Sequence, residues 1–463
     1  MSPPRPLVCG VDVARALRLL IVGLASLVLA GEARAAGPLG RQGSPITTSS
    51  YTIDLFQGPL IGSSRVTAMA GAVVAIAAGA DIMTSNPATP AVRYYSSHSV
   101  TDWNAGIEWR FPSQLNSTDF DNNGTKGFTF NDFVFLSTSG YVQEGPLGIG
   151  IALDLQQYSL GRPDGQTAVQ SASVRLAQMH AMAAYSIKDE LHLGFGLRGA
   201  VFVIRDSGQS ELTAVPGTGG LLTMAGLSPE LGAMWAPRSL PLRLGLALRA
   251  PVVGKATTSD ITPDAAGDLR IGSLYIPRTI ARPWEVEWGF AVQFGPRPLN
   301  IPWYDSRRVP REELEQYRKT PDDTRVVLIN RYDRRRRARF PRPKFLLAAS
   351  FLVTGPTENA VGIESFLAQR VDRSGRRATF TPRIGVETEV VPDWVVFRSG
   401  LYLEPTRFDQ SSPRLHTTFG AESRLFSWDV FGSFDSPVPF RLGANLDVAR
   451  DYYDWNWTWG LWW

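Results

Sequence analysis

The sequence has little cysteine, little charge and no long apolar run. A single cysteine, Cys9, occurs among 463 residues, and charged residues make up only 19%. The cysteine count excludes a disulfide scaffold, and no internal apolar run reaches the about 18 residues of a spanning helix, which excludes a polytopic helical membrane protein. Glycine (43 residues) and aromatic residues (11%) are plentiful. Low charge and many aromatics without long apolar runs are typical of a membrane β-barrel.

The positive charge is concentrated in one segment. Residues 297–344 hold 15 Lys and Arg against 7 Asp and Glu, whereas the whole chain carries a net charge of +4. Outside this segment and the first 35 residues the chain is acidic, so its charge does not indicate nucleic-acid binding. We expect no nucleic-acid partner.

The N-terminus predicts export. Residues 1–35 combine a basic start, an apolar stretch over 19–30 and the small-residue site Ala33-Arg34-Ala35, which is the pattern of a cleaved signal peptide. The alternative, an N-terminal membrane anchor, needs a longer apolar run. Because Cys9 precedes the apolar stretch, it leaves with the signal peptide, and the exported chain has no cysteine.

Apolar residues recur with a period of two from about residue 101. In 147–155, Leu and Ile alternate with Gly, Ala and Asp, and in 242–249 Leu alternates with Arg, Gly and Ala. Alternation of this kind predicts strands with one apolar face and one small or polar face. A soluble β-sandwich would give the same pattern, so the alternation alone does not decide between sandwich and barrel.

The spacing of turns adds to the case for a barrel. Short connections interleave with long ones, which is typical of outer-membrane barrels. We expect an all-β fold, a transmembrane antiparallel β-barrel of about 14 strands (14–16) over residues 101–463, located in the cell outer membrane. Residues 36–100 would form an N-terminal extension and hatch, and an Arg-rich loop insertion would occupy about 305–343. The expected strands are 101–111, 127–141, 146–160, 170–187, 190–205, 224–236, 241–252, 283–294, 297–304, 344–353, 360–371, 381–391, 394–404, 414–427, 438–449 and 453–463.

The last strand gives the most specific signal. Trp455, Trp457, Trp459 and Trp463 share one face, and an aromatic residue ends the chain. Tryptophan suits the membrane interface, where its ring is apolar and its N–H meets water. We expect these four residues to anchor the barrel in outer-membrane lipid and the strand to be read by the barrel-assembly machinery. The alternative, an edge strand of a soluble sheet, would expose a long aromatic edge.

Three stretches carry a family resemblance. Residues 68–80 are rich in Gly and Ala and precede the turn Asn86-Pro87-Ala88, residues 241–252 form a short Leu-rich strand, and residues 381–405 form a late strand pair. Together they resemble the long-chain fatty acid transporter (FadL-like) family of outer-membrane proteins. The resemblance implies a barrel of about fourteen strands that is plugged by an N-terminal hatch and passes hydrophobic molecules.

The resemblance also implies a function for the hatch. We expect uptake of small hydrophobic molecules such as long-chain fatty acids, by binding in the lumen and hatch movement. The residues expected to gate are Met69, Gly71, Gly79, Asn86 and Pro87, although a static plug would use the same residues. A structural or docking barrel associated with secretion or envelope assembly is the alternative, and its sign would be a filled lumen without an apolar cavity. A general polar porin fits the hatch less well. Residues 36–60 are polar and Gly/Ser/Thr-rich, so we expect them to be mobile.

Two weaker motifs predict ligands. Asp119, Asp121 and Asn123 followed by Gly124 match the first half of a calcium loop, but the twelfth position is Phe130, which cannot supply the bidentate carboxylate. The alternative is an Asp/Asn/Gly turn. We expect no cofactor other than this calcium candidate.

The insertion 305–343 contains four consecutive arginines. If it lies on the rim with the long loops, Arg334, Arg335, Arg336 and Arg337 would contact anionic lipid headgroups. A solvated loop is the alternative.

Catalysis is not expected. The sequence has no G-x-S-x-G, H-E-x-x-H or phosphate-binding loop and no Cys/His cluster. His180 and His192 are expected on adjacent strands with their side chains toward the lumen, where polar residues are usual.

Overall fold

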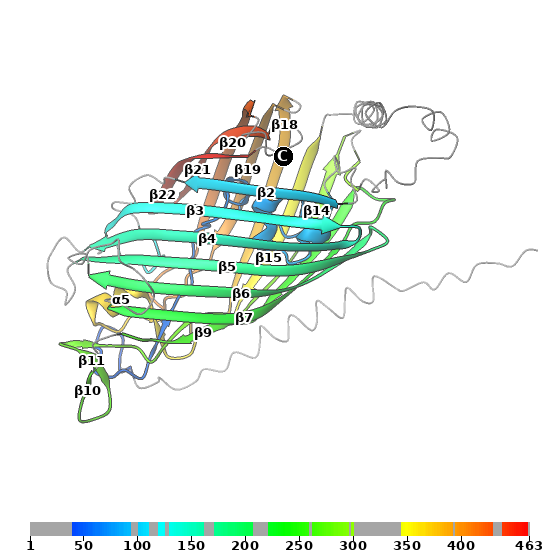
Figure 1. Ribbon diagram of the computed structural model, residues 1–463. Coiled ribbons are helices and arrows are strands. Elements are labelled where there is room, and N and C mark those ends of the chain that lie inside the picture. The colour runs from blue at the N-terminus through cyan, green and yellow to red at the C-terminus, as the bar shows by residue number, and fades with distance from the viewer. Residues whose placement is uncertain are drawn as a thin grey trace, which may run out of the picture. The chain divides into compact units, whose positions relative to one another are not determined.

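The fold is a closed β-barrel. The computed structural model describes residues 39–93, 101–110, 119–125, 129–161, 171–206, 221–258, 262–295, 298–300, 344–391, 394–428 and 438–461. Within these residues, fourteen antiparallel strands close in the order β14-β15-β18-β19-β20-β21-β22-β2-β3-β4-β5-β6-β7-β8 (Figure 1). The strands that come first and last along the chain, β2 and β22, pair at Trp109–Trp459 and Arg110–Thr458. The strands are β2 (Thr101–Arg110), β3 (Thr129–Glu144), β4 (Leu147–Gly161), β5 (Ser171–Ile187), β6 (Leu191–Asp206), β7 (Leu222–Trp235), β8 (Leu242–Arg249), β14 (Glu285–Phe294), β15 (Phe345–Thr354), β18 (Thr379–Val391), β19 (Val395–Glu404), β20 (Arg414–Trp428), β21 (Val438–Ala449) and β22 (Tyr452–Leu461).

The predicted alternation separates the outside of the barrel from its lumen. On β4, Ile149 and Ile151 are 59% and 56% exposed, whereas Gly150 and Ala152 between and beside them are buried. Large apolar side chains are exposed on the outer face of most barrel strands. A continuous apolar surface of this extent is unstable in water and matches the lipid-facing band of a membrane barrel. The barrel is therefore that of an outer-membrane protein.

One of the sixteen expected strands is wrong, and another lies mostly outside the described residues. In 360–371 only Ala360–Val361 forms a strand (β16), and Ile363–Ala368 forms the helix α5. The spacing of Ile363, Phe366 and Leu367 is helical and not alternating, which is why a strand does not form there. Of the expected strand 297–304, residues 298–300 lie outside any strand, where Pro298 removes a backbone donor, and the remaining residues lie outside the described residues. The other fourteen expectations each correspond to a barrel strand.

Most of the short connections share one rim of the barrel. Connections 145–146, 188–190 and 236–241 lie on this rim, which we call the short-turn rim, and 250–284 and 355–378 lie on the opposite long-loop rim, together with the two-residue turn 450–451. Because antiparallel neighbours alternate in direction, the connection from β14 to β15 starts and ends at the short-turn rim. The lipid contact predicted for Arg334–Arg337 assumed the other rim. These arginines lie outside the described residues, and their contact with lipid stays a prediction.

A small sheet covers the long-loop rim. Its order is β17-β16-β1-β13-β9, and its central strand β1 (Thr52–Asp54) comes from the N-terminal segment. The partners of β1 are parallel strands of two long connections, β13 (Thr279–Arg282) and β16. The two outer strands of this sheet are β9 (Val252–Lys255) and β17 (Arg373–Ser374). A separate three-stranded sheet consists of β10 (Thr262–Pro263), β11 (Leu269–Ile271) and β12 (Leu274–Tyr275).

Residues 39–61, which we call the N-terminal segment, are packed against the barrel wall, whereas the sequence predicts a mobile stretch over 36–60. Ile53 is fully buried and Leu55 nearly so, and both belong to an apolar cluster with lumen-facing residues such as Phe135 and Phe202. The sequence did not reveal this because the buried residues of the segment are spaced irregularly among polar ones. At the long-loop end, the lumen is filled by this cluster.

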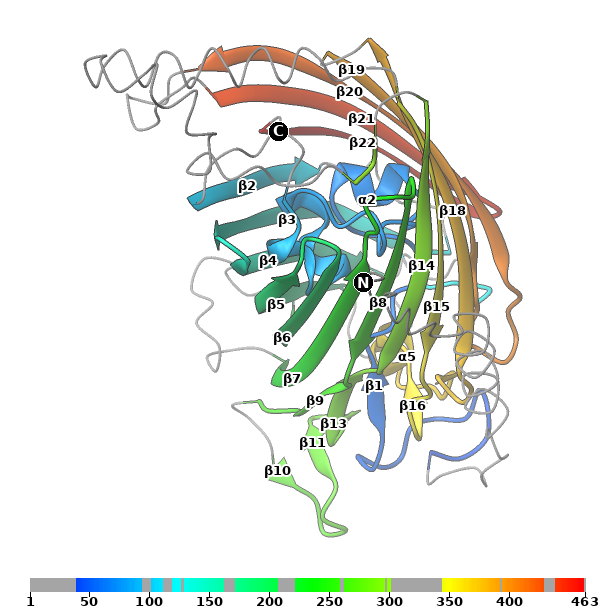
Figure 2. The same ribbon diagram turned by 90° about the vertical axis from the view of Figure 1, so that its right-hand side faces the viewer.

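The hatch, residues 63–93, lies inside the barrel toward the short-turn rim. It contains α2 (Ser64–Ala68) and the 3₁₀ turns η1 (Ala80–Ser85) and η2 (Thr89–Ala91). Figure 2 shows α2 and the neighbouring turns surrounded by barrel strands. None of the helices in the described residues is long and apolar enough to cross a membrane.

Candidate functional site: the hatch and its two cavities

Lumen-facing glycines of the wall accommodate the hatch. A Cβ atom added to Gly194 on β6 would lie 2.2 Å from the Pro87 carbonyl oxygen, and one on Gly245 of β8 would lie 2.3 Å from the Val74 carbonyl oxygen. Because these neighbours are backbone atoms, any side chain at these positions would displace the hatch. A Cβ atom would also meet hatch backbone atoms at Gly148, Gly232 and Gly385, and hatch alanine methyl groups at Gly400 and Gly420, on strands from opposite sides of the barrel. We call these seven residues the wall glycines.

The predicted Asn-Pro-Ala turn is present and buried. Asn86 is 0% exposed and donates from Nδ2 to the carbonyl oxygens of Val74 at 2.9 Å and of Ala233 on β7 at 3.2 Å. Its Oδ1 accepts from the Ala88 amide at 3.0 Å. A single side chain thus connects two parts of the hatch and the wall.

The five residues predicted to gate all lie in the hatch. Met69 is completely buried, and Gly71 and Gly79 have φ values of 72° and 111°, which side chains disfavour. Asn86 and Pro87 form the turn against Gly194 and Gly232. Their position agrees with either a gate or a static plug, so gating stays a prediction.

Ion pairs connect the hatch to the wall. Arg65 of α2 donates from Nε to Glu387 of β18 at 3.0 Å and from Nη1 to the Ala78 carbonyl at 2.7 Å. Asp81 of η1 lies 3.5 Å from Arg441 of β21. Removing one partner of a buried pair costs about 3–5 kcal/mol because the other charge is left uncompensated. These contacts therefore specify one position of the hatch.

A network of charges continues around the wall. Arg398 lies 2.7 Å from Glu387 and 2.8 Å from Glu422, and Arg441 lies 3.1 Å from Glu108. These side chains come from β2, β18, β19, β20 and β21 and are all nearly buried. This part of the wall beside the hatch is charged, as expected of lumen residues in a membrane barrel.

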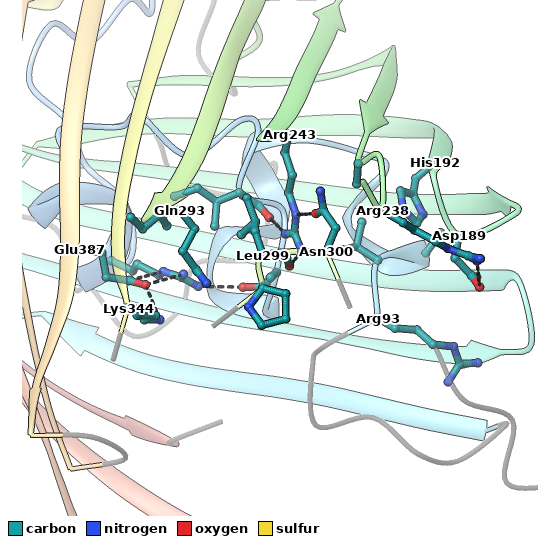
Figure 3. A pocket seen from close by; sticks show the side chains of 18 residues that line it. Arg93, Asp189, His192, Arg238, Arg243, Gln293, Leu299, Asn300, Lys344 and Glu387 are labelled. Atoms are coloured by element: carbon teal, nitrogen blue, oxygen red, sulfur yellow. Dashed lines mark hydrogen bonds and ion pairs between the residues drawn. The ribbon is translucent and has the colours of Figure 1, made fainter. Parts of the chain in front are cut away.

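A cavity of about 90 Å³ lies between the hatch and the short-turn rim (Figure 3). Its wall residues include His192, Arg243, Lys344 and Glu387, and the hatch contributes Arg65 and Ile76. We call it the lower cavity. Arg243 is hydrogen-bonded to Ile76, Leu299 and Asn300 and connects the hatch to the wall at this point.

A second cavity, of about 160 Å³, lies between the hatch and the N-terminal segment. Six charged residues contribute to its lining, among them Arg249, Glu285 and Glu287, with Arg249 3.3 Å from Glu287 and 3.6 Å from Glu285. His180 borders it and lies 3.0 Å from Glu230. We call it the upper cavity. The upper cavity is lined mainly by polar groups and the lower cavity by polar and apolar groups in similar measure, so neither is the clearly apolar cavity whose absence was the sign expected of the docking alternative.

His180 and His192 face the lumen on β5 and β6, as predicted, but they belong to different cavities. Sequence reasoning missed Arg243, Arg249 and Glu387 as site residues. Alternation had already assigned Arg243 and Arg249 to the inner face of β8. Their contacts with the hatch carbonyls required the three-dimensional fold.

The calcium candidate forms a turn stabilised by its own side chains. Asp119 accepts from the amides of Asn123 at 3.0 Å and Gly124 at 2.8 Å, and Asp121 accepts from Asn123 at 3.3 Å. Asn123 Nδ2 donates to Glu364 of α5 at 2.8 Å. No group of three or more His, Cys, Asp or Glu placed to hold a metal is found in the described part of the chain. The geometry is that of the turn alternative, and calcium binding stays untested.

The tryptophans of β22 face outward. Trp455 and Trp457 are 46% and 44% exposed, and Trp459 stacks on Trp109 across the barrel seam at 6.3 Å between ring centroids. Trp463 lies outside the described residues. Their role as interface anchors stays a prediction.

The chain is similar to solved structures that are named as a FadL homologue, a transporter and a channel. The chain is similar to a Pseudomonas aeruginosa FadL homologue at 11% identity over 89% of this chain and 98% of that chain, with a TM-score of 0.47. The Pseudomonas putida toluene transporter TodX matches at 13% identity over 90% of this chain and 98% of that one, with a TM-score of 0.42. The CymD monoaromatic hydrocarbon channel matches at 12% identity over 86% and 96%, with a TM-score of 0.46. No protein-family profile and no curated protein sequence matches the chain. The FadL-like family, which the sequence motifs resemble, is thus represented among the structures to which this barrel is similar.

Proposed function

We propose that the protein is an outer-membrane channel for uptake of small hydrophobic molecules such as long-chain fatty acids, by binding in the lumen and movement of the hatch. The observation that carries this proposal is the hatch itself, which separates the upper cavity from the lower cavity and contacts wall glycines on opposite sides of the lumen. A ligand cannot pass from one cavity to the other unless the hatch moves. Uptake is therefore coupled to a conformational step.

The outer face of the barrel and the similar solved structures agree with this role. The outer face is apolar, as expected of a barrel surrounded by lipid. The named similar structures include channels for hydrocarbons and toluene. Outer-membrane lipid and the assembly machinery remain the expected partners.

The docking alternative is favoured by one observation. The long-loop end of the lumen is filled by apolar side chains of the N-terminal segment, and both cavities carry charged linings. A barrel that serves as a docking component needs no continuous path. The two functions differ in whether the hatch must move, and this difference can be measured.

A reversible cross-link between hatch and wall tests the proposal. Asn445 of β21 donates from Nδ2 to Ser64 Oγ of α2 at 2.8 Å, so the two side chains face each other. The predicted exported chain contains no cysteine, and Ser64→Cys/Asn445→Cys would therefore introduce one defined disulfide. Liposomes containing this variant should take up labelled oleate when reduced and lose uptake when oxidised.

The single variants Ser64→Cys and Asn445→Cys are the matched controls, since each removes the same hydrogen bond without the cross-link. Their uptake should not respond to oxidation. Equal uptake by the oxidised and reduced double variant would refute hatch movement. If unaltered protein takes up neither oleate nor toluene, the channel proposal fails and the docking barrel becomes the better interpretation.

A further inference from the structure

A histidine of the barrel wall has a carboxylate at each of its ring nitrogens. His416 of β20 is fully buried, with Nδ1 2.8 Å from Asp447 of β21 and Nε2 2.6 Å from Glu404 of β19. A ring nitrogen donates a hydrogen bond only when it carries a proton, and an ionised carboxylate only accepts. If both carboxylates are ionised, the two contacts therefore require a proton on each ring nitrogen, which is the imidazolium ion.

Neighbouring donors keep both carboxylates ionised. Arg414 donates from Nε and Nη2 to the two oxygens of Glu404, which is a bidentate ion pair. Tyr402 donates from its hydroxyl to the second oxygen of Asp447 at 2.8 Å. Neither carboxyl group thus needs a proton of its own, and the protons in the two contacts with His416 belong to the ring.

Two aromatic rings complete the surroundings of this histidine. Tyr402 stacks on His416 with 4.2 Å between the ring centroids, and Tyr452 of β22 lies 5.1 Å away. The face of an aromatic ring attracts a cation, so both neighbours suit a positively charged imidazole.

The charged groups on the neighbouring elements also favour a positive ring. Asp454 of β22 lies opposite Asp447 in the strand register, and Arg414 contacts the carbonyl of Asp119. The charged residues on the elements beside His416 are therefore Asp119, Glu404, Arg414, Asp447 and Asp454. Carboxylates outnumber the single guanidinium among them, and the excess negative charge attracts a proton to the ring.

The same cluster supports the N-terminal segment where that segment lines the upper cavity. The Leu60 amide donates to the Tyr402 hydroxyl at 3.3 Å, and Gly58 lies so close to Glu404 that a Cβ atom would overlap its carboxylate. Residues 57–60, which we call the roof, line the upper cavity and contain no titratable side chain. The roof thus lies against two residues whose positions depend on the charge of His416.

We propose that His416 is a fixed imidazolium ion that holds the roof over the upper cavity, and that loss of its proton to water in alkaline solution releases the roof. A neutral ring has one donor and one bare nitrogen, and the bare nitrogen would face a carboxylate oxygen at 2.8 or 2.6 Å. One carboxylate must then move, and the contact of Glu404 with Gly58 or of Tyr402 with Leu60 is lost with it.

The sign of the pH dependence follows from this arrangement. The ring stabilises the seated roof at neutral and mildly acidic pH, and this stabilisation is lost as the pH rises past the point at which His416 loses its proton. The role of the roof goes beyond the proposed function, because it concerns access to the upper cavity from the long-loop rim and not movement of the hatch.

Nitrogen NMR tests the charge of the ring. The full-length exported chain is labelled in its histidines alone and kept in detergent micelles. The sequence has four histidines, and His416→Gln identifies the signals of the one in question. Both nitrogens of His416 should give protonated signals at about pH 8, where an ordinary histidine is mostly neutral. His192, whose Nδ1 makes no hydrogen bond in the described part of the chain, should show one bare nitrogen and is the reference.

Hydrogen exchange measures the release of the roof. The exchange rate of the Leu60 amide is divided by that of the Thr52 amide, which donates to the Asn359 carbonyl at 3.1 Å, so that the effect of pH on intrinsic exchange cancels. Because glutamine resembles the neutral ring in having one donor end, His416→Gln should raise this ratio by about tenfold or more at neutral pH. The ratio in the unaltered protein should rise in alkaline solution together with the loss of the His416 proton.

His192→Gln is the matched control, since it changes a buried lumen histidine on the other side of the hatch. Its ratio should equal that of the unaltered protein. Tyr402→Phe removes the hydroxyl and keeps both carboxylates, so it should raise the ratio while His416 remains protonated on both nitrogens.

Two results would overturn the proposal. A bare nitrogen on His416 at about pH 8 would assign the shared proton to a carboxyl group. An unchanged ratio would show that the ring does not hold the roof, either in folded His416→Gln or in the unaltered protein once NMR shows the proton lost. The second comparison needs no variant, so it stands even if His416→Gln does not fold. The hatch cross-link is assayed at neutral pH with the roof seated, so its failure and the failure of this switch are separate results.

Discussion

Replacing Gly194 by alanine should displace the Asn86-Pro87-Ala88 turn and leave the barrel intact. A Cβ atom at residue 194 would lie 2.2 Å from the Pro87 carbonyl oxygen and 2.5 Å from the Ala88 amide nitrogen. Ordinary contact begins at about 3.4 Å, so the turn has to move by about 1.2 Å. Because both neighbours are backbone atoms, no side-chain rotation relieves the contact.

Overpacking of this kind costs about 1–3 kcal/mol. The added methyl group contacts the hatch and not an adjacent strand, so we expect the cost to fall on the seating of the hatch. An equilibrium between seated and displaced hatch would shift by about 5- to 150-fold toward the displaced state.

Hydrogen exchange and conductance measure this shift. The amides of Thr89 and Val92, which donate within the hatch to Asn86 and Thr89 at 3.0 and 2.9 Å, should exchange faster in Gly194→Ala. Conductance in planar bilayers should rise because the plug fits less well.

Gly199→Ala is the control on the same strand. Its Cβ would have no neighbour closer than 3.6 Å, so hatch exchange and conductance should not change. Identical exchange and conductance in Gly194→Ala and Gly199→Ala would refute the claim that wall glycines seat the hatch. Lower barrel stability in Gly194→Ala without faster hatch exchange would also contradict it.

Three further perturbations test other parts of the structure. Ile151→Arg places a charge on the lipid-facing side of β4 and should destabilise the barrel in bilayers by about 2–4 kcal/mol, measured by denaturant unfolding, whereas the barrel would tolerate it if this face met water. Asp54→Ala leaves the fully buried Arg407, 2.8 Å away, without its carboxylate and should destabilise the β1 sheet by about 3–5 kcal/mol. Amide exchange at Thr52–Asp54 should become faster. The exposed pair Arg376–Asp409 is the control, and equal effects of Asp54→Ala and Asp409→Ala would contradict the argument. Hydrogen bonds from the backbone amide and hydroxyl of Ser49 hold the pKa of Asp268 below its ordinary 3.8. The Ser49–Asp268 contact therefore stabilises the folded state above that pH, and this stabilisation is lost as pH falls through the lowered pKa. A pH titration of the chemical shift of the Ser49 amide should show this loss, and Asp268→Asn should abolish the response.

The sequence predicted most of the barrel because lipid imposes a strict alternation. Residues such as Ile149 and Ile151 must be apolar where they meet lipid, and that requirement is visible along a single strand. The same requirement made the fourteen strand positions recognisable. It did not apply to residues 360–371, which lie beyond the membrane and form α5.

The site was less predictable because its contacts join residues that are far apart along the chain. Small residues at Gly194 and Gly245 were visible as the inner face of strands, but their relation to Pro87 and Val74 depends on the position of the hatch. His416 is another case, since it is fully buried between Asp447 at 2.8 Å and Glu404 at 2.6 Å on neighbouring strands. Pairing of this kind follows from strand register, which a single sequence does not specify.

The parallel pairing of β1 constrains the order in which the molecule assembles. Thr52 lies opposite Thr279, 227 positions later, and opposite Ala360 on its other side. The segment made first therefore completes its hydrogen bonds only after most of the chain exists, and contacts of such long sequence separation form slowly. We expect the N-terminal segment and hatch to occupy the curved sheet before β22 joins β2. Pairing of β22 with β2 at Trp109 and Trp459 would then enclose the N-terminal segment and the hatch, which could not leave the barrel again during its assembly.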